Sequence, residues 1–161
     1  MNNATAMANG ATLNSGKESA FLLWLNAGQI ITSATFTSST QALVAGTNQW
    51  FTLRNSSKQL LKVTADDTST AWSATTSKTL TFSGGTYTVV TSGYYYVGIM
   101  VAAGTPPSLL QTTAGGSGAY AIAPAIGGRD DVNTGLTTPA TAVATLGAFT
   151  SANSIPYAYV S

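Results

Sequence analysis

The chain of 161 residues contains neither cysteine nor histidine. Without cysteine it forms no disulfide and no thiolate site. The absence of histidine removes the commonest general base and the commonest side-chain ligand of transition metals. Because enzymes usually depend on such groups, we expect no catalytic residue, no metal site and no cofactor.

Charged residues are also scarce, at 7% of the chain, against about 25% in an average soluble domain. Lysine and arginine number six, aspartate and glutamate five, and the net charge is +1. Nucleic acids and anionic membranes are bound through a strongly cationic surface, so neither is an expected partner. Solubility must come from threonine, serine, asparagine, glutamine and glycine.

Long hydrophobic runs are missing as well. No stretch of about 18 apolar residues, which a helix needs to cross a bilayer, occurs in the chain. The N-terminal residues do not combine a cationic segment with an apolar one, so we expect synthesis in the cytoplasm without a secretory signal peptide.

The longest apolar run, residues 93–103, is predicted to be the central strand of the fold. Alternate residues of a strand face opposite sides, which places Tyr96 and Met100 on one face and Val97 on the other. Both faces are apolar, as expected of a central strand rather than an edge strand. Gly98, the β-branched and aromatic residues, and the prolines that follow favour a strand over a buried helix.

Further strands are predicted where alternating or apolar segments are bounded by turn-forming residues. Three pairs should form hairpins: residues 19–25 with 29–37, 48–54 with 59–64, and 78–83 with 86–90. Gly84-Gly85 in the last pair is the strongest signal, since glycine supplies the positive φ of a two-residue hairpin turn. Residues 65–72 fit either a helical turn capped by a carboxylate or a loop pinned by one.

These segments predict an all-β protein, an antiparallel β-sandwich of jelly-roll type, with residues 18–161 as one domain. Residues 1–17 are interpreted as an N-terminal arm, either frayed or ordered against a neighbouring subunit. Residues 111–150 are predicted to be a long loop rich in glycine, alanine and threonine, with one strand at 119–123. Residues 155–160 are predicted to return as a strand of the same domain.

Paired carboxylates occur at Asp66-Asp67 and at Asp130-Asp131. Adjacent side chains usually point in different directions, so we expect turn or capping roles rather than acid–base catalysis. Residues 131–135 resemble the start of a calcium loop, but the later glutamate that would complete the ligand set is missing. No Gly-x-Ser-x-Gly elbow and no phosphate-binding glycine motif are found.

Aromatic rings are the remaining candidates, because an amphipathic ring covers a sugar face while its polar tip makes a hydrogen bond. Core packing is expected for the rings in predicted strands, namely Trp24, Trp50, Tyr95 and Tyr96. Core packing is not assigned to Trp72 and Tyr120. They are the residues predicted to contact a glycan or a protein partner.

Several segments resemble a known family: residues 47–53, 64–67 with 71–72, 78–80, 93–103 with Pro106-Pro107, and 156–161. The resemblance is to virion proteins of tailed bacteriophages that infect actinobacteria, commonly described as minor tail proteins. It covers about the middle third of the chain and the last residues. None of these motifs is catalytic.

The resemblance implies a β-rich, usually multimeric module on the surface of the phage particle, on the tail or on the head. Its expected partners are other virion proteins, such as the major capsid or tail proteins, and further copies of itself. The chain is short and its first 17 residues match no part of the family, so a head decoration or fibre role is as compatible as a tail role. Binding of a host cell-surface glycan is the alternative expectation.

Overall fold

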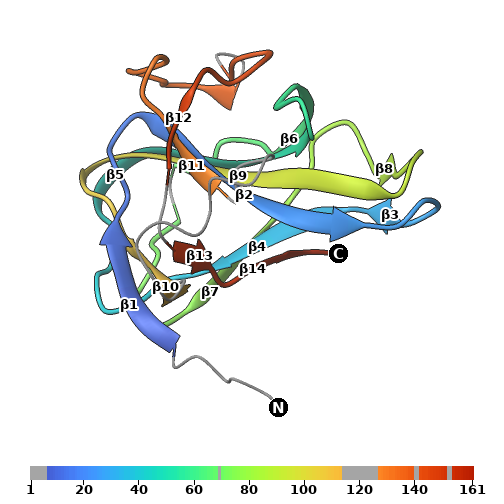
Figure 1. The fold of residues 1–161 in the computed structure, drawn as a ribbon. Helices are drawn as coiled ribbons and strands as arrows, with labels where there is room; N and C mark the ends of the chain where they lie inside the picture. Colours follow the sequence, from blue (N-terminus) through green and yellow to red (C-terminus); the bar gives the residue numbers. More distant parts are fainter. Residues whose placement is uncertain (1–6, 69, 114–126, 140–141, 152–153) are drawn as a thin grey trace.

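The computed structural model describes residues 7–68, 70–113, 127–139, 142–151 and 154–161 (Figure 1). These ranges form strands and no α-helix, which confirms the predicted all-β class for them, and they include no helix able to cross a membrane. All strand pairs are antiparallel. The strands are β1 (Met7–Thr12), β2 (Lys17–Leu25), β3 (Ile30–Ile31), β4 (Ser33–Thr37), β5 (Val44–Asn55), β6 (Leu60–Val63), β7 (Ser77–Thr81), β8 (Tyr87–Thr88), β9 (Gly93–Thr105), β10 (Ser108–Thr113), β11 (Gly127–Asp130), β12 (Phe149–Ser151), β13 (Ser154–Pro156) and β14 (Ala158–Val160).

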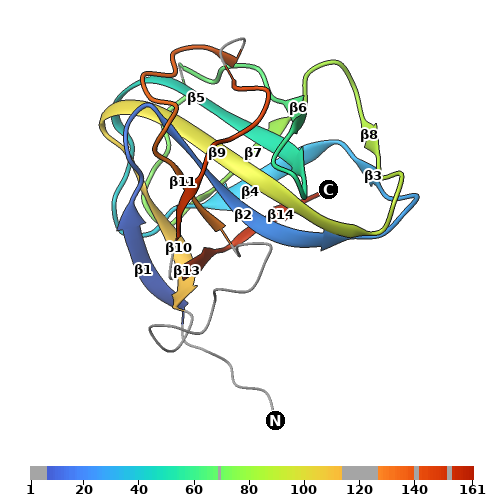
Figure 2. The same ribbon diagram turned by 45° about the horizontal axis from the view of Figure 1, so that its top comes forward.

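The largest sheet is built around β9, as the sequence predicts. Its six strands follow the order β12-β11-β2-β9-β5-β6 (Figure 2). Val97 pairs with Phe21 of β2, and Met100 pairs with Trp50 of β5. Because both faces of β9 are apolar, Val97 joins the core on one side of the sheet while Tyr96 and Met100 join smaller clusters on the other.

The inner face of this sheet packs against a three-stranded sheet of order β14-β4-β7. The rings of Phe36 in β4 and Phe51 in β5 meet edge to face, with centroids 4.9 Å apart. Ile31 and Val89 from the short β3-β8 ribbon join the same buried cluster. This cluster therefore connects the six-stranded sheet, the three-stranded sheet and the β3-β8 ribbon. Burying each such side chain stabilises the fold by roughly 1.5–3 kcal/mol.

Part of the predicted N-terminal arm is a strand of the fold. β1 pairs with β10, and β10 pairs with β13, which makes a third sheet. The Ser15 hydroxyl donates to the carbonyl of Ala103 at 2.9 Å, and Lys17 already belongs to β2. Composition did not reveal this strand because backbone hydrogen bonds to a neighbouring strand need no apolar side chain.

The predicted hairpin between residues 19–25 and 29–37 is wrong. β2 pairs with β9 and β11, whereas β3 pairs with β8 and β4 pairs with β7 and β14. The chain does turn after β2, with Gly28 at a φ of 85°. This turn carries the chain out of the large sheet and into the elements that face it.

The predicted hairpin at Gly84-Gly85 is wrong for the same reason. Both glycines have the positive φ values expected there, 71° and 84°. However, β7 pairs with β4 and β8 pairs with β3, so the turn joins strands of two different sheets. Turn residues determine where a chain reverses, but they do not determine which strand becomes its neighbour.

The third predicted hairpin is confirmed, because β5 and β6 pair across residues 55–58. The Asn55 side-chain carbonyl accepts from the backbone N–H groups of Ser57 and Gln59, both at 3.0 Å. Such an asparagine bond to its own turn replaces backbone pairing where the chain reverses. The following residues 65–72 form a loop in their described part, so the capped helical turn is not found.

The predicted long loop, residues 111–150, contains β11 and β12 in its described part. β11 lies between β2 and β12. A Cβ at Gly127 would come within 2.7 Å of Phe21, and one at Gly128 within 2.6 Å of Phe149, so this strand fits because it begins with two glycines. The strand predicted at residues 119–123 lies outside the described residues.

Residues between β11 and β12 cover part of the outer face of the large sheet. Leu146 packs with Ala20 and Tyr96, and Leu136 packs with Trp50 and Met100. Ala20, Trp50, Tyr96 and Met100 on this face are therefore buried, although no second sheet lies over them in the described part of the chain. We call the described residues of this stretch, 131–139 and 142–148, the covering segment.

A buried ion pair lies where the covering segment meets the sheet. Both oxygens of the Glu18 carboxylate accept from the Arg54 guanidinium, at 2.7 and 2.8 Å, and both side chains are completely buried. Arg54 also donates to the carbonyls of Val143 and Lys58, at 2.9 and 3.1 Å. The arginine thus links the sheet to the covering segment.

The C-terminal strand prediction is confirmed in outline, but the segment forms two strands. β13 pairs with β10 and β14 pairs with β4. Between them the Tyr157 N–H donates to the carbonyl of Leu110 at 2.7 Å. The rings of Tyr157 and Tyr159 are exposed, with centroids 6.3 Å apart.

Candidate functional site

Trp72, one of the two residues predicted to contact a ligand, is a core residue. Its side chain is 2% exposed and packs edge to face on Phe51, with ring centroids 6.2 Å apart. The indole N–H donates to the carbonyl of Thr76 at 3.0 Å. The ring therefore offers no open face for a sugar. The other predicted residue, Tyr120, lies outside the described residues.

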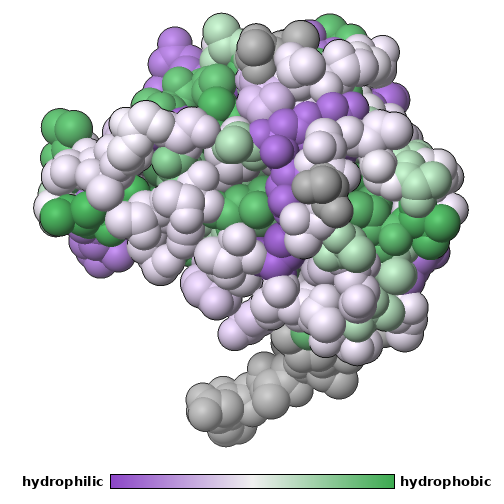
Figure 3. All heavy atoms as spheres, turned by 180° about the vertical axis from the view of Figure 1, so that it is seen from behind, coloured by the Kyte–Doolittle hydropathy of each residue, from purple (hydrophilic) through white to green (hydrophobic). Residues whose placement is uncertain are grey.

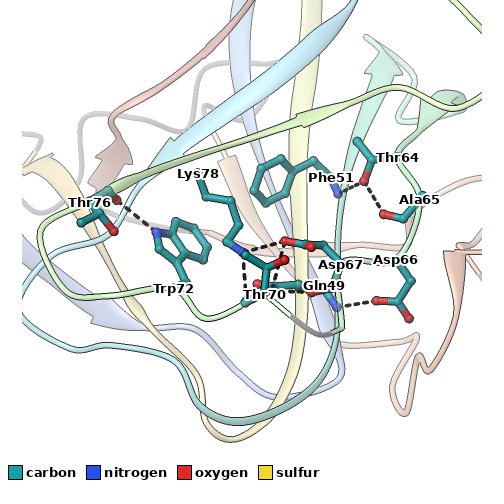
Figure 4. A network of polar contacts seen from close by, with 10 residues as sticks. All are labelled: Gln49, Phe51, Thr64, Ala65, Asp66, Asp67, Thr70, Trp72, Thr76 and Lys78. Carbon is teal, nitrogen blue, oxygen red and sulfur yellow. Dashed lines mark hydrogen bonds and ion pairs between the residues drawn. The ribbon is translucent and has the colours of Figure 1, made fainter.

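The loop that carries Trp72 is fastened to β5 and β7 by two carboxylates (Figure 4). Asp66 accepts from the backbone N–H of Gln49 at 2.9 Å and from the Asn48 side-chain amide at 2.6 Å. Asp67 forms an ion pair with Lys78 of β7 at 2.6 Å. The prediction that this aspartate pair pins a loop is confirmed. We call this network the loop clamp.

Gln49 completes the loop clamp from inside the protein. Its side-chain amide donates to the backbone carbonyls of Asp67 and Thr70, at 2.6 and 2.9 Å. Figure 4 shows Gln49, Asp67, Thr70 and Lys78 converging beside the Trp72 ring. The acid and the base at this point are bound to each other, so the arrangement suits positioning of the loop rather than proton transfer.

A surface depression of about 380 Å³ lies over the loop clamp. Its lining residues are Asp67, Thr70, Ala71, Trp72, Ser73, Thr76, Ser77, Lys78, Thr79 and Leu80. Hydroxyl groups dominate this lining, and Trp72 and Lys78 contribute little exposed surface. The depression is thus polar and lacks an aromatic platform.

Trp24 is the exposed tryptophan of this protein, contrary to the prediction that it packs in the core. Its side chain is 53% exposed, whereas Trp50 is fully buried as predicted. In β2 the residues next to it, Leu23 and Leu25, face the inner core, so alternation turns Trp24 to the outer face. The covering segment buries Ala20 farther along this face and does not bury Trp24.

Tyr94 pairs with Trp24 across the two neighbouring strands. The two residues are directly opposite in the register of β2 and β9, and their rings meet edge to face with centroids 5.1 Å apart. Tyr94 is 47% exposed, whereas the next two residues, Tyr95 and Tyr96, are buried as predicted. We call Trp24 and Tyr94 the aromatic pair.

Further apolar surface lies at the same end of the molecule. Ile30 of β3 and Val90, just after β8, are both exposed. Seen from behind, part of the hydrophobic surface lies at the left, the end formed by β3 and β8, and other parts lie at the right and the upper left (Figure 3). Trp24, Ile30, Val90 and Tyr94 thus lie at one end of the β2 and β9 strands, and the other exposed large hydrophobic residues are Val44, Val132, Ile155, Tyr157 and Tyr159.

A smaller depression, of about 140 Å³, adjoins the aromatic pair through Tyr94. Its lining residues are Asn55, Ser56, Thr91, Ser92, Gly93, Tyr94 and Tyr95. The Tyr95 hydroxyl donates to the carbonyl of Thr91 at 2.9 Å, and the Ser92 hydroxyl accepts from the backbone N–H of Ala27 at 2.8 Å. The rim of the depression is therefore held in place by internal bonds.

The second carboxylate pair has the predicted turn role. Asp130 accepts from the N–H groups of Val132, Asn133 and Gly147 and from the Asn133 side chain. Burial raises its pKa, but these bonds outweigh that effect and lower the pKa overall. Its oxygens are thus occupied by N–H donors. No group of three metal-ligating side chains occurs in the described part of the chain.

Asp131 points the other way and connects three elements. Its carboxylate accepts from Arg129 at 2.6 and 2.9 Å, from Lys17 at 2.7 Å, and from the Thr150 hydroxyl. These bonds, that from Arg129 first, hold the pKa of the carboxyl well below its ordinary range. This cluster ties β11, β12 and the start of β2 together.

Fold and surface together define an antiparallel all-β protein whose exposed candidate groups are aromatic rings and hydroxyls. Sequence reasoning selected Trp72 and Tyr120 as contact residues, whereas the described rings that are exposed in β2 and β9 are those of Trp24 and Tyr94. Comparison of the chain with protein-family models, with curated proteins and with solved structures finds no match.

Proposed function

We propose that the chain is a non-enzymatic structural protein on the surface of a bacteriophage particle, either a capsid decoration or head-fibre protein or a minor tail protein. It acts through contacts with other virion proteins and with its own copies. In this proposal the fold is a β-sandwich of jelly-roll type, and the protein is made in the host cytoplasm.

The sandwich architecture is supported by the core that the two main sheets share. Phe21 and Phe51 from the six-stranded sheet and Phe36 from the three-stranded sheet belong to one buried cluster. The rings of Phe21 and Phe36 meet across it with centroids 6.4 Å apart. Two sheets that bury apolar faces against each other are the basis of sandwich folds.

The observation that carries the proposal is the convergence of the segments that resemble the phage proteins. Asn48-Gln49 and Phe51 in β5, Asp66-Asp67, Trp72 and Lys78 are separated in the sequence but meet in the loop clamp (Figure 4). Such a set of contacts fixes a fold rather than a reaction. The segments on which the resemblance rests thus belong to one structural unit of the fold.

The hydroxyl groups of the three-stranded sheet also suit repeated contacts between uncharged surfaces of copies of the protein. On the three-stranded sheet Thr35 bonds to Thr79 and Thr37 to Ser77, both at 2.8 Å between hydroxyl oxygens. Because Phe36 faces the core, Thr35 and Thr37 lie on the opposite face of β4, where Thr35 is buried while Ser77 and Thr79 of β7 are exposed. A hydroxyl-rich β-surface stays hydrated without like-charge repulsion between copies, which favours a homo-oligomer.

Immunogold labelling of purified particles of the phage that encodes the chain tests this proposal. Label over the head supports a decoration or head-fibre protein, and label at the tail supports a minor tail protein. Absence of label from intact particles, with an antibody that binds the free folded protein, contradicts a virion surface location. Mass spectrometry of the same particles should detect the chain.

A second test asks whether the N-terminal residues attach the protein to the phage particle. Deleting residues 1–6 leaves β1 intact, whereas deleting residues 1–17 removes β1 and the first residue of β2. If the segment attaches the protein, the shorter deletion should leave a folded protein that no longer joins the particle. Normal incorporation of that variant would remove residues 1–6 from the attachment mechanism.

A further inference from the structure

The small depression beside Tyr94 presents hydroxyl groups that have no internal partner. None of its lining residues is charged. Within the described part of the chain the hydroxyls of Ser56, Thr91 and Tyr94 make no hydrogen bond, and all three residues are exposed. Each can both donate and accept. The depression therefore suits a ligand that is rich in hydroxyls and carries no charge.

Tyr94 lines the depression, and Trp24 packs against Tyr94 from β2, on the other side of β9 from Asn55 of β5. The indole N–H of Trp24 donates to the Asn26 side chain at 3.2 Å, and the backbone N–H of Asn26 donates to the Gln29 side chain at 2.6 Å. Together with the edge-to-face contact to Tyr94, these bonds hold the indole in one orientation. An aromatic surface fixed before binding loses little conformational entropy when a ligand arrives.

We propose that the aromatic pair and the adjoining depression bind one unit of an uncharged polysaccharide. A pyranose ring has C–H groups on its faces and hydroxyls around its rim. The rim hydroxyls of a unit in the depression match Ser56 and Thr91, and its face matches the exposed ring of Tyr94, to which Trp24 adds apolar surface on the neighbouring strand. This inference does not depend on a virion location, because it concerns a property of the isolated protein.

The volume of the depression and the lack of a nearby free lysine among the described residues further limit the kind of ligand that fits. Drug-sized ligands occupy pockets of roughly 300–1,000 Å³, whereas this depression measures about 140 Å³, so it admits a single sugar unit while the chain of the polysaccharide extends outside. A phosphate or uronate group would need a cation. The nearest lysine in the sequence, Lys58, is engaged elsewhere, since its ammonium donates to the Gly147 carbonyl and lies 4.7 Å from the centroid of Phe149.

Tryptophan fluorescence gives a direct test, because Trp24 is exposed while Trp50 and Trp72 are buried. The full chain is titrated with a soluble glucan, mannan, galactan and arabinan, and with a polyuronate as the charged comparison. We expect saturable change in emission with at least one neutral glycan and none with the polyuronate. Tyr94→Ala should weaken this binding about tenfold, which corresponds to loss of one favourable ring contact.

Tyr159→Ala is the matched control, since Tyr159 is also a strand tyrosine with 47% exposure but lies on β14. It should bind like the unmodified protein. Two further variants, Ser56→Ala and Thr91→Val, remove the hydroxyls without removing a ring. Each should weaken glycan binding and should unfold at the same urea concentration as the unmodified protein.

Three outcomes overturn the inference. The first is no binding of any neutral glycan by the folded protein, and the second is binding that Tyr94→Ala leaves unchanged. The third is self-association, measured by analytical ultracentrifugation, that Trp24→Ala abolishes while no glycan competes, because this would assign the surface to a second copy of the chain. The first two outcomes leave the virion proposal unchanged, and the third agrees with its contacts between copies; the gold labelling tests the virion location separately.

Discussion

Gly98 approaches Glu18 so closely that a Cβ at position 98 would lie 2.4 Å from the carboxylate oxygen Oε1. The same Cβ would lie 2.2 Å from the Thr52 hydroxyl. Neither neighbour can move away easily, since the Glu18 carboxylate is bound by Arg54 and by Thr52 in a completely buried site. The glycine in the middle of the central strand thus makes room for an ion pair.

Gly98→Ala should therefore destabilise the protein by about 1–3 kcal/mol, the usual cost of overfilling a packed site. Gly93→Ala is the control in the same strand, because a Cβ there meets nothing within 4 Å. That control should unfold at the same urea concentration as the unmodified protein or slightly above it. Equal unfolding midpoints for the two variants would contradict the crowding described here.

Removing one member of the buried ion pair should cost more. Arg54→Met leaves the Glu18 carboxylate buried without its counterion, and Val143 loses a donor to its carbonyl. We expect a loss of about 3–5 kcal/mol in the free energy of unfolding, measured by urea titration. The double variant Glu18→Leu with Arg54→Met should recover part of this loss, since it leaves no unpaired charge. A double variant less stable than Arg54→Met alone would count against this explanation.

Acrylamide quenching should identify Trp24 as the tryptophan in contact with solvent. Trp24→Phe should remove most of the quenching, because the rings of Trp50 and Trp72 are buried. Trp72→Phe should instead lower stability and leave the quenching constant nearly unchanged. Quenching that persists in Trp24→Phe would show that a buried tryptophan becomes accessible.

Acidification should weaken the fold partly through Asp131. Its pKa is lowered in the folded protein by bonds from Arg129, Lys17 and Thr150, so its contribution is complete above its unfolded pKa. The contribution is lost as the pH falls below about 4, toward the lower folded pKa. Asp131→Asn should be less stable than the unmodified protein at pH 7, and the two unfolding curves should converge at low pH. A difference that stays constant from pH 7 to pH 2 would contradict this assignment.

The sequence predicts where the strands of this fold lie better than it predicts which strands pair. β9 is recognisable because its two apolar faces require burial on both sides, and the turn at residues 55–58 is recognisable from its side chains. The turns at Gly28 and at Gly84-Gly85 are also present, but the two strands that each turn joins do not pair with each other. Strand pairing depends on long-range packing, which local turn chemistry does not contain.

The candidate site shows the same limit for single side chains. Trp24 follows the alternation of β2, but its exposure depends on where the covering segment ends, more than 100 residues later in the chain. Trp72 lies in a loop, yet it is buried because the loop clamp holds it against Phe51. The strand β11 was missed because its first residues are glycines, which carry no hydrophobic pattern.

The position of β9 also determines the order of events during synthesis. Its partners precede it by a long stretch of chain, since Val97 pairs with Phe21 and Met100 pairs with Trp50. β2 and β5 therefore leave the ribosome with their apolar residues unpaired until β9 emerges between them. Strand pairing over such separations makes folding slow and exposes aggregation-prone strands meanwhile. High-level expression should then depend on how well the cell keeps this unfinished sheet from associating with others.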